Sequence, residues 1–278
     1  MNQVNTIPDF KDIASKLDKI KGPDHGTIPS RNEIISILKD MQSLMFPAYY
    51  IRCEQQGKSK VQILSELYVR LSCQIRLALE LEGREDELDC DALSGELVES
   101  LPRIAEMLLK DVQAIYEGDP AARSYEEVIL SYPGFYAITV YRIAHEFYKR
   151  KIPLISRLMT EYAHEKTGID IHAGATIGEY FFIDHGTGIV VGETTTIGNR
   201  VKLYQGVTLG ARSFETDSDG NPVKGIKRHP DIGNNVIIYA NATILGGNTK
   251  IGDGAVIGGN VWLTRSVEPG ATVYYNIK

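Results

Sequence analysis

The chain of 278 residues is long enough for one large or two modest domains, and its 43% hydrophobic and 24% charged residues are ordinary for a soluble globular protein. A net charge of −6 argues against a general nucleic-acid-binding protein, which normally carries a basic domain or face. No apolar run approaches the ~18 residues that span a bilayer, and the polar N-terminus is unlike a signal peptide, so we expect neither a nucleic-acid nor a membrane partner.

The three cysteines are Cys53, Cys73 and Cys90. Their number and spacing fit neither a disulfide framework nor a set of metal ligands. We therefore expect a protein of the reducing cytoplasm that binds no metal.

Residues 1–28 show no sustained hydrophobic periodicity, and we expect them to form a mobile or loosely docked arm. A helical domain is predicted over 29–167. Its first helix begins near Ser30, which fits a capping box with Glu33, and the helical spacing ends at Pro47. Similar apolar spacing predicts helices around 64–75, 104–115, 135–145 and 154–166, with an acidic, solvated helix end and loop at 80–91.

From about residue 169 the spacing changes, and aliphatic side chains recur every six residues. This period fits neither a helix nor an alternating strand, but it is typical of a parallel β-helix in which three hexapeptides close one triangular coil of about 18 residues. A glycine-rich β-sandwich would not keep so many aliphatic positions in register. The two main series are Ile171, Ile177, Ile183 and Ile189, and, two positions later, Val191, Ile197, Leu203 and Leu209; the spacing resumes between Ile232 and Leu263.

The predicted fold class is therefore α+β: an N-terminal all-α helical domain followed by a C-terminal left-handed parallel β-helix of hexapeptide repeats. We expect the β-helix over 168–267 and a short tail over 268–278. Glycines that follow the aliphatic positions, as in Ile177-Gly178, suit the tight corners of such coils.

The repeat is broken twice. Ile177-Gly178 and Ile197-Gly198 are 20 residues apart, two more than one coil, and this slip falls around Asp184-His185-Gly186. After Leu209 about 17 residues leave the coil, which predicts an extended loop over 211–228. A regular solenoid offers little chemistry of its own, so polar residues at the two breaks are the candidates for a functional site.

One pair of these residues has a spacing that suits acid–base chemistry. Asp170 precedes His185 by 15 residues, just under one coil, so the two side chains could meet across one coil step. A carboxylate bonded to one imidazole nitrogen leaves the other nitrogen as a base. We therefore predict His185 as a base, whereas a structural role is the simpler interpretation of His172 and His145. The polar residues at the breaks are Asp170, His172, Asp184, His185, Arg228 and His229.

Several segments together resemble serine O-acetyltransferases, a family of the hexapeptide-repeat acyltransferase superfamily. The repeat alone indicates only the superfamily, whereas the Asp-His-Gly-Thr-Gly segment together with Arg-His-Pro is far more specific. The resemblance covers at least 119–267. It is carried by Asp170-Ile171-His172, by 183–194 with Asp184-His185-Gly186-Thr187-Gly188, by 205–210, by Arg228-His229-Pro230, and upstream by Asp119-Pro120-Ala121, Tyr132-Pro133-Gly134-Phe135 and 141–145.

The resemblance implies transfer of an acetyl group from acetyl-CoA to the hydroxyl of L-serine, giving O-acetylserine for cysteine biosynthesis. His185 matches the family's general base, and Asp170 matches its partner. The residues that match the binding groups are Arg228 and His229 for the carboxylate of serine, and Asp119 and Asp184 for its ammonium group. A zwitterion requires one cationic and one anionic contact, which agrees with these residue types. The thioester chemistry requires no metal.

The resemblance also implies a homotrimer, possibly joined into a dimer of trimers, with acetyl-CoA in the groove between neighbouring subunits. Small residues are expected along this groove, and Gly210, Ala211, Ala240 and Gly259 match those positions, although Ala211 stands where glycine is more usual. Many members end in an isoleucine that plugs the active site of O-acetylserine sulfhydrylase. Lys278 follows Ile277 here, so we expect that partnership to be weak or absent.

Three alternatives remain open. A hexapeptide-repeat acetyltransferase for a sugar or amino sugar would share the fold, acetyl-CoA and the histidine, but would not need both Arg228-His229 and Asp119. A γ-class carbonic anhydrase would require three histidines on one zinc, such as His172, His185 and His229. A catalytically silent assembly scaffold would have no use for these polar residues.

Overall fold

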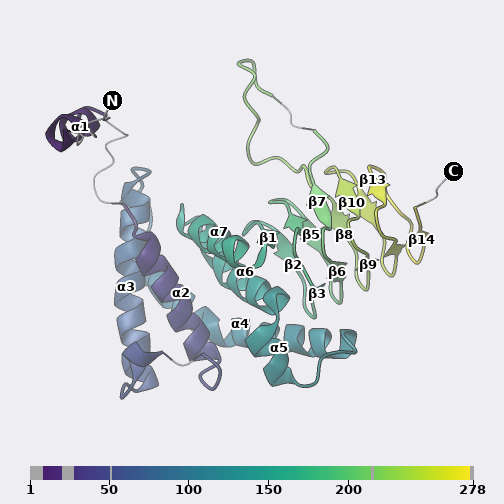
Figure 1. Ribbon diagram of the computed structural model, residues 1–278, viewed down its shortest axis with the longest axis horizontal. Coiled ribbons are helices and arrows are strands. Elements are labelled where there is room, and N and C mark those ends of the chain that lie inside the picture. Colours follow the sequence, from purple (N-terminus) through teal and green to yellow (C-terminus); the bar gives the residue numbers. More distant parts are fainter. Residues whose placement is uncertain (1–8, 21–27, 51, 214–215, 276–278) are drawn as a thin grey trace, which may run out of the picture.

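The computed structural model describes residues 9–20, 28–50, 52–213 and 216–275 and has a helical domain followed by a parallel β-helix (Figure 1). The predicted α+β fold class is thereby confirmed. None of the described helices is long and apolar enough to cross a membrane. The helices are α1 (Phe10–Asp18), α2 (Arg31–Met45), η1 (Cys53–Gln55, a short 3-10 helix), α3 (Lys60–Glu80), α4 (Cys90–Gly118), α5 (Tyr125–Ser131), α6 (Pro133–Lys149) and α7 (Ile155–Thr167).

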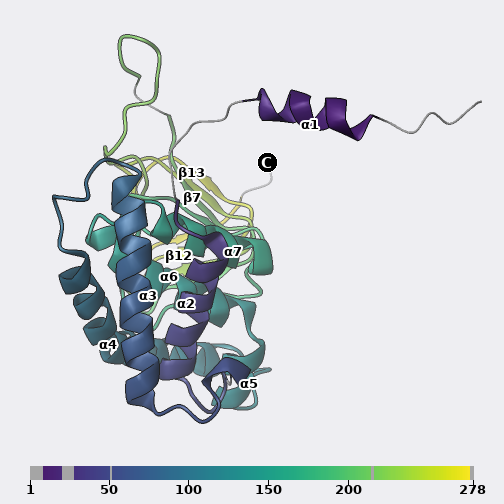
Figure 2. The same cartoon turned by 90° about the vertical axis from the view of Figure 1, so that its left-hand side faces the viewer.

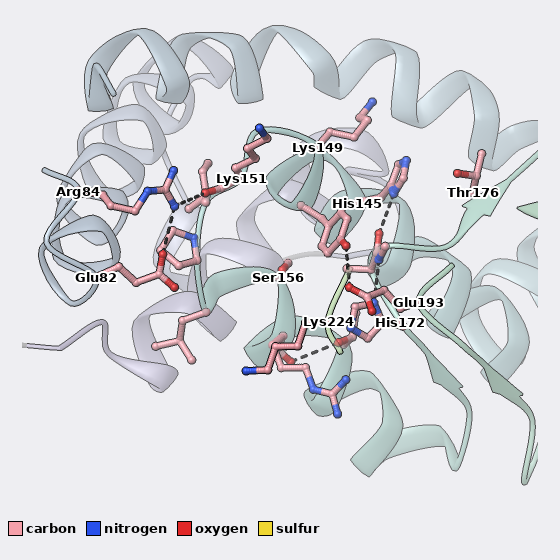
Figure 3. A pocket seen from close by; sticks show the side chains of 18 residues that line it. Glu82, Arg84, His145, Lys149, Lys151, Ser156, His172, Thr176, Glu193 and Lys224 are labelled. Atoms are coloured by element: carbon pink, nitrogen blue, oxygen red, sulfur yellow. Dashed lines mark hydrogen bonds and ion pairs between the residues drawn. The ribbon is translucent and has the colours of Figure 1, made fainter. Parts of the chain in front are cut away.

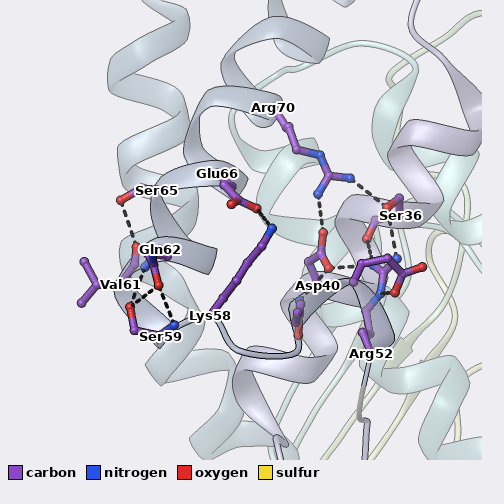
Figure 4. Close-up of polar contacts among 12 residues, drawn as sticks. Ser36, Asp40, Arg52, Lys58, Ser59, Val61, Gln62, Ser65, Glu66 and Arg70 are labelled. Atoms are coloured by element: carbon purple, nitrogen blue, oxygen red, sulfur yellow. Dashed lines mark hydrogen bonds and ion pairs between the residues drawn. The ribbon is translucent and has the colours of Figure 1, made fainter.

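The helices α2, α3 and α4 lie side by side (Figure 2), and capping residues set where they begin. The Ser30 hydroxyl oxygen accepts a hydrogen bond from the Glu33 N–H, as predicted. The Glu33 carboxylate, however, pairs with Arg70, so this capping box is only half formed. A reciprocal capping box joins Ser59 and Gln62 at the start of α3 (Figure 4).

Buried Asp40 joins α2 to its neighbours (Figure 4). Its carboxylate accepts hydrogen bonds from Arg52 and Gln55, both at 2.7 Å, and from Arg70 of α3. A buried carboxylate is tolerated only when it is paired in this way. The cluster therefore fixes the segment between α2 and α3 to both helices.

Part of the predicted N-terminal arm, 1–28, is helical. Helix α1 begins after Asp9, whose carboxylate accepts hydrogen bonds from the Lys11 and Asp12 N–H groups. All of its residues are exposed, including Phe10 and Leu17. The sequence analysis missed this helix because so short an apolar series has too few repeats to stand out. Residues 1–8 and 21–27 lie outside the described part of the chain.

Among the described residues, fourteen short strands form three parallel sheets. Up to β13, strands three apart along the chain are neighbours, as a three-sided coil requires, and β14 pairs with β12. The predicted hexapeptide series is confirmed, because the aliphatic side chains stack in register, as Ile171 does on Val191 and Val191 on Leu209. Sheet A has the order β1-β4-β7-β10-β13, sheet B β11-β8-β5-β2 and sheet C β14-β12-β9-β6-β3.

The strands follow one another around the prism, from sheet A to sheet B to sheet C. They are β1 (Asp170–Ile171), β2 (Thr176–Ile177), β3 (Phe182–Asp184), β4 (Val190–Val191), β5 (Thr196–Ile197), β6 (Lys202–Tyr204), β7 (Thr208–Gly210), β8 (Asp231–Ile232), β9 (Ile237–Ile238), β10 (Thr243–Leu245), β11 (Lys250–Ile251), β12 (Val256–Ile257), β13 (Trp262–Leu263) and β14 (Thr272–Val273).

We call the corners that lead from sheet C to sheet A the C–A edge, and those from sheet A to sheet B the A–B edge. The C–A edge comprises 185–189, 205–207, 239–242 and 258–261, and the A–B edge comprises 172–175, 192–195, 211–230 and 246–249.

The β-helix continues beyond its predicted end at 267. Strand β14 pairs with β12, Val273 lying beside Ile257, so part of the predicted tail, 268–278, belongs to the last coil. The six-residue series runs on from Val267 to Val273, but the turn at Pro269-Gly270 obscured it in the sequence. The terminal residues on which the expectation about the sulfhydrylase rests, 276–278, lie outside the described part of the chain.

Helix α6 docks the helical domain on the first coil. Arg142 pairs with Asp111 of α4 at 2.6 Å, and its guanidinium also donates to the backbone oxygen of Gly178 at 2.8 Å. The Tyr141 hydroxyl donates to the Ala175 oxygen at 2.5 Å. His145 Nδ1 lies 2.7 Å from a backbone oxygen of the same coil, in line with its predicted structural role. The first coil is thereby held at a fixed position on the helices.

Candidate functional site

The first break of the repeat lies at the C–A edge. In the first coil Val190 follows Asp184 by six positions, whereas their register partners Thr208 and Tyr204 are four apart. The two additional residues therefore lie in the corner that contains His185, as the sequence predicted. His185 adopts a φ of +57°, in the left-handed region that histidine enters more readily than most residues. Its side chain is 71% exposed, which leaves the imidazole accessible to a substrate.

Two carboxylates lie close to this imidazole. Asp184 Oδ1 is 3.6 Å from His185 Nδ1. Asp119, which follows α4, accepts hydrogen bonds from the Tyr132 hydroxyl at 2.5 Å and from the Ala121 N–H at 2.8 Å. These hydrogen bonds, Tyr132 first, lower the pKa of Asp119, and the nearby His185 contributes to the same effect. Both residues predicted to accept the ammonium group are thus beside the predicted base.

Asp170, the predicted partner of His185, begins strand β1 and is half-buried. Its N–H donates to the Ile189 oxygen at 2.9 Å, and Ile189 closes the corner that contains His185. Within the described residues, no hydrogen bond joins Asp170 to His185. The two residues thus lie at the same edge of the first coil, and the predicted contact between them stays a prediction.

The second break returns to the coil at the A–B edge through Arg228 and His229. His229 is buried over Gly192, where an added Cβ would lie 2.0 Å from the imidazole. Desolvation by burial, and next the positive charge of Arg228, lower the pKa of His229 to about 4. Its Nδ1 accepts a hydrogen bond from the Thr194 N–H at 3.1 Å. The neutral imidazole therefore carries its proton on Nε2, as a donor.

Arg228 is fixed by two residues that the sequence analysis did not single out as site residues. Its Nη2 donates to Glu193 Oε2 at 2.5 Å, and its backbone N–H donates to Thr194 Oγ1 at 3.0 Å. The sequence feature that could have pointed to Glu193 and Thr194 is an acidic residue next to a hydroxyl residue at a coil corner. Their roles depend on how the returning loop packs against this corner, which the spacing of the repeat does not predict.

The predicted site residues thus separate into two groups, because one chain places them at two edges of the prism. Sheet A lies between the edges. The C–A group contains Asp119, Asp170, Asp184 and His185 with the small residues Ala240 and Gly259, and the A–B group contains Arg228 and His229 with Gly210 and Ala211. The C–A group therefore holds both predicted catalytic residues, whereas the predicted serine-binding and acetyl-CoA-binding residues are divided equally between the two groups.

Two cavities adjoin the A–B edge. The larger, of about 1210 Å³, lies between the helical domain and the first coils (Figure 3), and its lining includes His172, Glu193 and Lys224. His172 Nδ1 accepts a hydrogen bond from the Gly174 N–H at 3.0 Å, in line with its predicted structural role. The other, of about 550 Å³, lies beneath the extended loop and is lined by Arg212, Lys227, Arg228 and Asn248, among others. Over the described ranges, no three His, Cys, Asp or Glu side chains are grouped as metal ligands.

Comparisons with known proteins point to one family. Residues 59–140 match the family model described as "Serine acetyltransferase, N-terminal". A plasmid-encoded serine acetyltransferase of Synechococcus elongatus is 43% identical over 260 residues, which cover 88% of this chain and 81% of the relative. The serine acetyltransferase of Bacillus subtilis is 47% identical over 167 residues, which cover 60% of this chain and 72% of the relative.

Solved structures agree with the sequence relatives. Serine acetyltransferase 1 of Entamoeba histolytica in complex with L-cysteine has a TM-score of 0.76 at 34% identity, covering 95% of this chain and 97% of that one. The serine acetyltransferase of Neisseria gonorrhoeae in complex with serine has a TM-score of 0.59 at 28% identity, covering 87% and 95%. Both the helical domain and the β-helix lie within these alignments.

Proposed function

The chain belongs to the serine acetyltransferase family, and we propose that it acetylates the hydroxyl of L-serine from acetyl-CoA with His185 as the general base. The product, O-acetylserine, serves cysteine biosynthesis. The observation that carries the assignment of His185 is its exposed imidazole at the slip of the first coil, beside two carboxylates. The alternative of a sugar or amino-sugar acceptor would leave these carboxylates and Arg228 without a function.

In this mechanism His185 removes the proton from the serine hydroxyl as the oxygen attacks the thioester carbonyl. The C–S bond breaks, and the imidazolium returns the proton to the departing CoA thiolate. We assign Asp170 to orient the imidazole and to stabilise the imidazolium, since Asp170 borders the same corner. An exposed imidazole is free to turn from Asp184 toward Asp170. General acid–base catalysis of this kind typically contributes about 10²–10⁴ to a rate.

The zwitterionic amino acid would be held from its two ends. Arg228 and the Nε2–H of neutral His229 would bind the carboxylate, because both present donors. Asp119 and Asp184 would accept from the ammonium group, and the lowered pKa of Asp119 keeps that carboxylate ionised at neutral pH. The hydroxyl of serine would then face His185.

Because the two ends of this binding site lie at different edges of one chain, we propose that the complete site forms between neighbouring chains of a homotrimer. The C–A edge of one chain would face the A–B edge of the next. Such a heterologous contact closes into a ring of three chains when each chain is related to the next by a rotation of one third of a turn. The ring then contains three equivalent sites. The separation of the two groups in the single chain supports this assembly.

Acetyl-CoA would lie in the same groove. The groove floor is suited to a backbone-bonded pantetheine arm, since a Cβ added at Gly259 would make a tight contact of 3.1 Å with the Ala240 oxygen. The cavity beneath the loop presents Arg212, whose charge suits a phosphate of CoA.

The unpaired state of the three cysteines, two of them exposed, supports the expected cytoplasmic location.

The proposed function is tested by following thiol release from acetyl-CoA with a panel of amino acids, sugars and amino sugars. L-Serine should give the highest kcat/KM, and serine methyl ester, which lacks the carboxylate charge, should be much poorer. An amino sugar that outperforms serine would establish the alternative. Absence of thiol release with every acceptor would establish a silent scaffold.

A further inference from the structure

A chain of hydrogen bonds runs from helix α6 to Arg228. The Tyr148 hydroxyl, in the last turn of α6, donates to Glu193 Oε1 at 2.9 Å. The other carboxylate oxygen, Glu193 Oε2, accepts from Arg228 Nη2 at 2.5 Å. Glu193 and His172 lie together at one end of the large cavity (Figure 3). The helical domain is thereby connected to the residue that we assign to the carboxylate of serine.

We propose that Tyr148 and Glu193 are positioning residues, which hold Arg228 in the orientation that binds the serine carboxylate. This inference rests on the proposed function of Arg228. Neither Tyr148 nor Glu193 needs to touch the substrate. Their effect is therefore on the affinity for serine and not on the chemical step.

Glu193 is held firmly enough to act in this way. Both of its oxygens are engaged, and only 22% of its side chain is exposed, as for Arg228. Desolvation opposes ionisation of Glu193, but hydrogen bonds from Arg228 and Tyr148 outweigh it and lower its pKa. The first coil leaves space for the pair at Gly174, where a Cβ would lie 2.7 Å from the Tyr148 ring and 2.9 Å from Glu193.

The orientation of Arg228 matters because guanidinium recognises a carboxylate through a fork of donors. With Nη2 bound to Glu193 and Nη1 directed at the Ile226 oxygen at 3.4 Å, the rotation of the guanidinium is fixed. A free arginine would lose rotamer freedom on binding serine, whereas a fixed one has already lost it. Removing the support should therefore raise the KM for serine.

Tyr148 is the last of a row of α6 side chains that contact the first coils. Residues four and three positions apart share one helix face, which places Tyr141, His145 and Tyr148 in this row. Tyr141 and His145 contact backbone oxygens, and Tyr148 contacts the Glu193 carboxylate instead. Tyr141→Phe is therefore a matched control: it removes a hydroxyl contact between the same helix and the coil that does not lead to Arg228.

The experiment measures kcat and both KM values of the full-length enzyme for Tyr148→Phe, Glu193→Gln, Arg228→Ala, Tyr141→Phe and the double variant Glu193→Gln/Arg228→Ala. We expect the KM for serine to rise about 3- to 10-fold in Tyr148→Phe and about 10-fold in Glu193→Gln, because each change removes or weakens a hydrogen bond of the ionised carboxylate that holds Arg228. The kcat and the KM for acetyl-CoA should change less than about twofold. Tyr141→Phe should leave the KM for serine unchanged, and the double variant should match Arg228→Ala.

Two results would overturn the inference. Equal increases of the serine KM in Tyr148→Phe and Tyr141→Phe would show that only the docking of α6 matters. If the fold increases of the serine KM in the two single variants multiply in the double variant, Glu193 acts independently of Arg228. If instead Arg228→Ala itself leaves the serine KM unchanged, the assignment of Arg228 under the proposed function is wrong, and the role of Tyr148 and Glu193 fails with it. Tyr148→Phe keeps the packed ring, and thermal unfolding of each variant identifies any that fail to fold.

Discussion

His185 and His229 lie at two different edges of the same β-helix and in opposite environments. The His185 side chain is 71% exposed, whereas His229 is 7% exposed and has a pKa lowered to about 4. An exposed imidazole next to carboxylates is suited to gaining a proton during catalysis, and a buried neutral one is suited to donating a fixed hydrogen bond. The different environments thus support different roles for two histidines of the proposed site.

His185→Ala should lower kcat by about 10²–10⁴, because a general base is removed. The midpoint of thermal unfolding should change little, since the exposed side chain contributes little packing. Thiol release and thermal unfolding measure the two quantities. His164→Ala, at another exposed histidine, is the control and should leave both unchanged. A near-normal kcat in His185→Ala would show that another group is the base.

Arg228→Ala should raise the KM for serine about 10- to 100-fold, as expected for loss of a charge-assisted hydrogen bond. The KM for acetyl-CoA should stay nearly constant. L-Cysteine differs from serine by one atom, so it should compete with serine, and its inhibition constant should rise in the same proportion. Equal increases of both KM values would show that Arg228 does not act on the amino acid alone.

The buried state of His229 predicts a pH dependence of stability. The unfolded chain binds a proton at this residue near pH 6.5, whereas the folded chain does so only near pH 4. Between these values the unfolded state binds more protons, so the free energy of unfolding decreases as the pH is lowered from 6.5 to 4. The loss from this residue is at most about 3 kcal/mol.

The contribution is isolated by comparing the urea midpoints of the wild type and His229→Asn at one chain concentration. Asn keeps an acceptor for the Thr194 N–H and does not titrate. The difference between the two proteins should be largest at pH 7 and shrink toward pH 4. A difference that is independent of pH would mean that His229 titrates alike in both states.

Asp111→Ala should decrease the free energy of unfolding by about 3–5 kcal/mol, because it leaves the buried guanidinium of Arg142 without its partner. The pair is almost fully buried at 3% and 0% side-chain exposure. Glu106→Ala, at an exposed position of the same helix, is the control and should change stability by less than about 0.5 kcal/mol. A small effect of Asp111→Ala in urea unfolding would show that this buried ion pair contributes little to stability.

The sequence predicted the β-helix and both of its breaks because every coil repeats the same requirement for an inward aliphatic side chain. Counting six residues at a time was therefore enough to locate His185 at a slip and Arg228 at the return of a loop. The contact of Tyr148 with Glu193 could not be predicted in this way. It depends on where α6 docks on the first coil, and that is set by three-dimensional contacts such as Arg142 with the Gly178 oxygen.

Other features were hidden by a lack of repetition. The β-helix was predicted to end at 267 because the Pro-Gly turn obscured the series that continues to Val273, and helix α1 has too few apolar positions to be recognised. Most important, the residue series shows which side chains share a break but not which edge of the prism each break occupies. The separation of His185 from Arg228 became visible only in three dimensions.

That separation makes the central claim testable with two variants that are each strongly impaired in kcat/KM for serine. His185→Ala destroys the contribution of the C–A edge, and Arg228→Ala destroys that of the A–B edge. If each site forms between neighbouring chains of a trimer, a trimer assembled from a mixture of the two variants contains some sites with both groups intact.

The most direct measurement is the kcat/KM for serine after the two variants are unfolded, mixed at equal concentration and refolded together. With random assembly, an intact His185 meets an intact Arg228 at about one quarter of the sites, so about a quarter of the wild-type kcat/KM should return. Variants refolded separately and then mixed are the control and should stay below about one tenth of the wild-type kcat/KM, because Arg228→Ala keeps part of its activity. If the jointly refolded mixture is no more active than this control while wild type refolds normally, the site lies within one chain, and the account is contradicted.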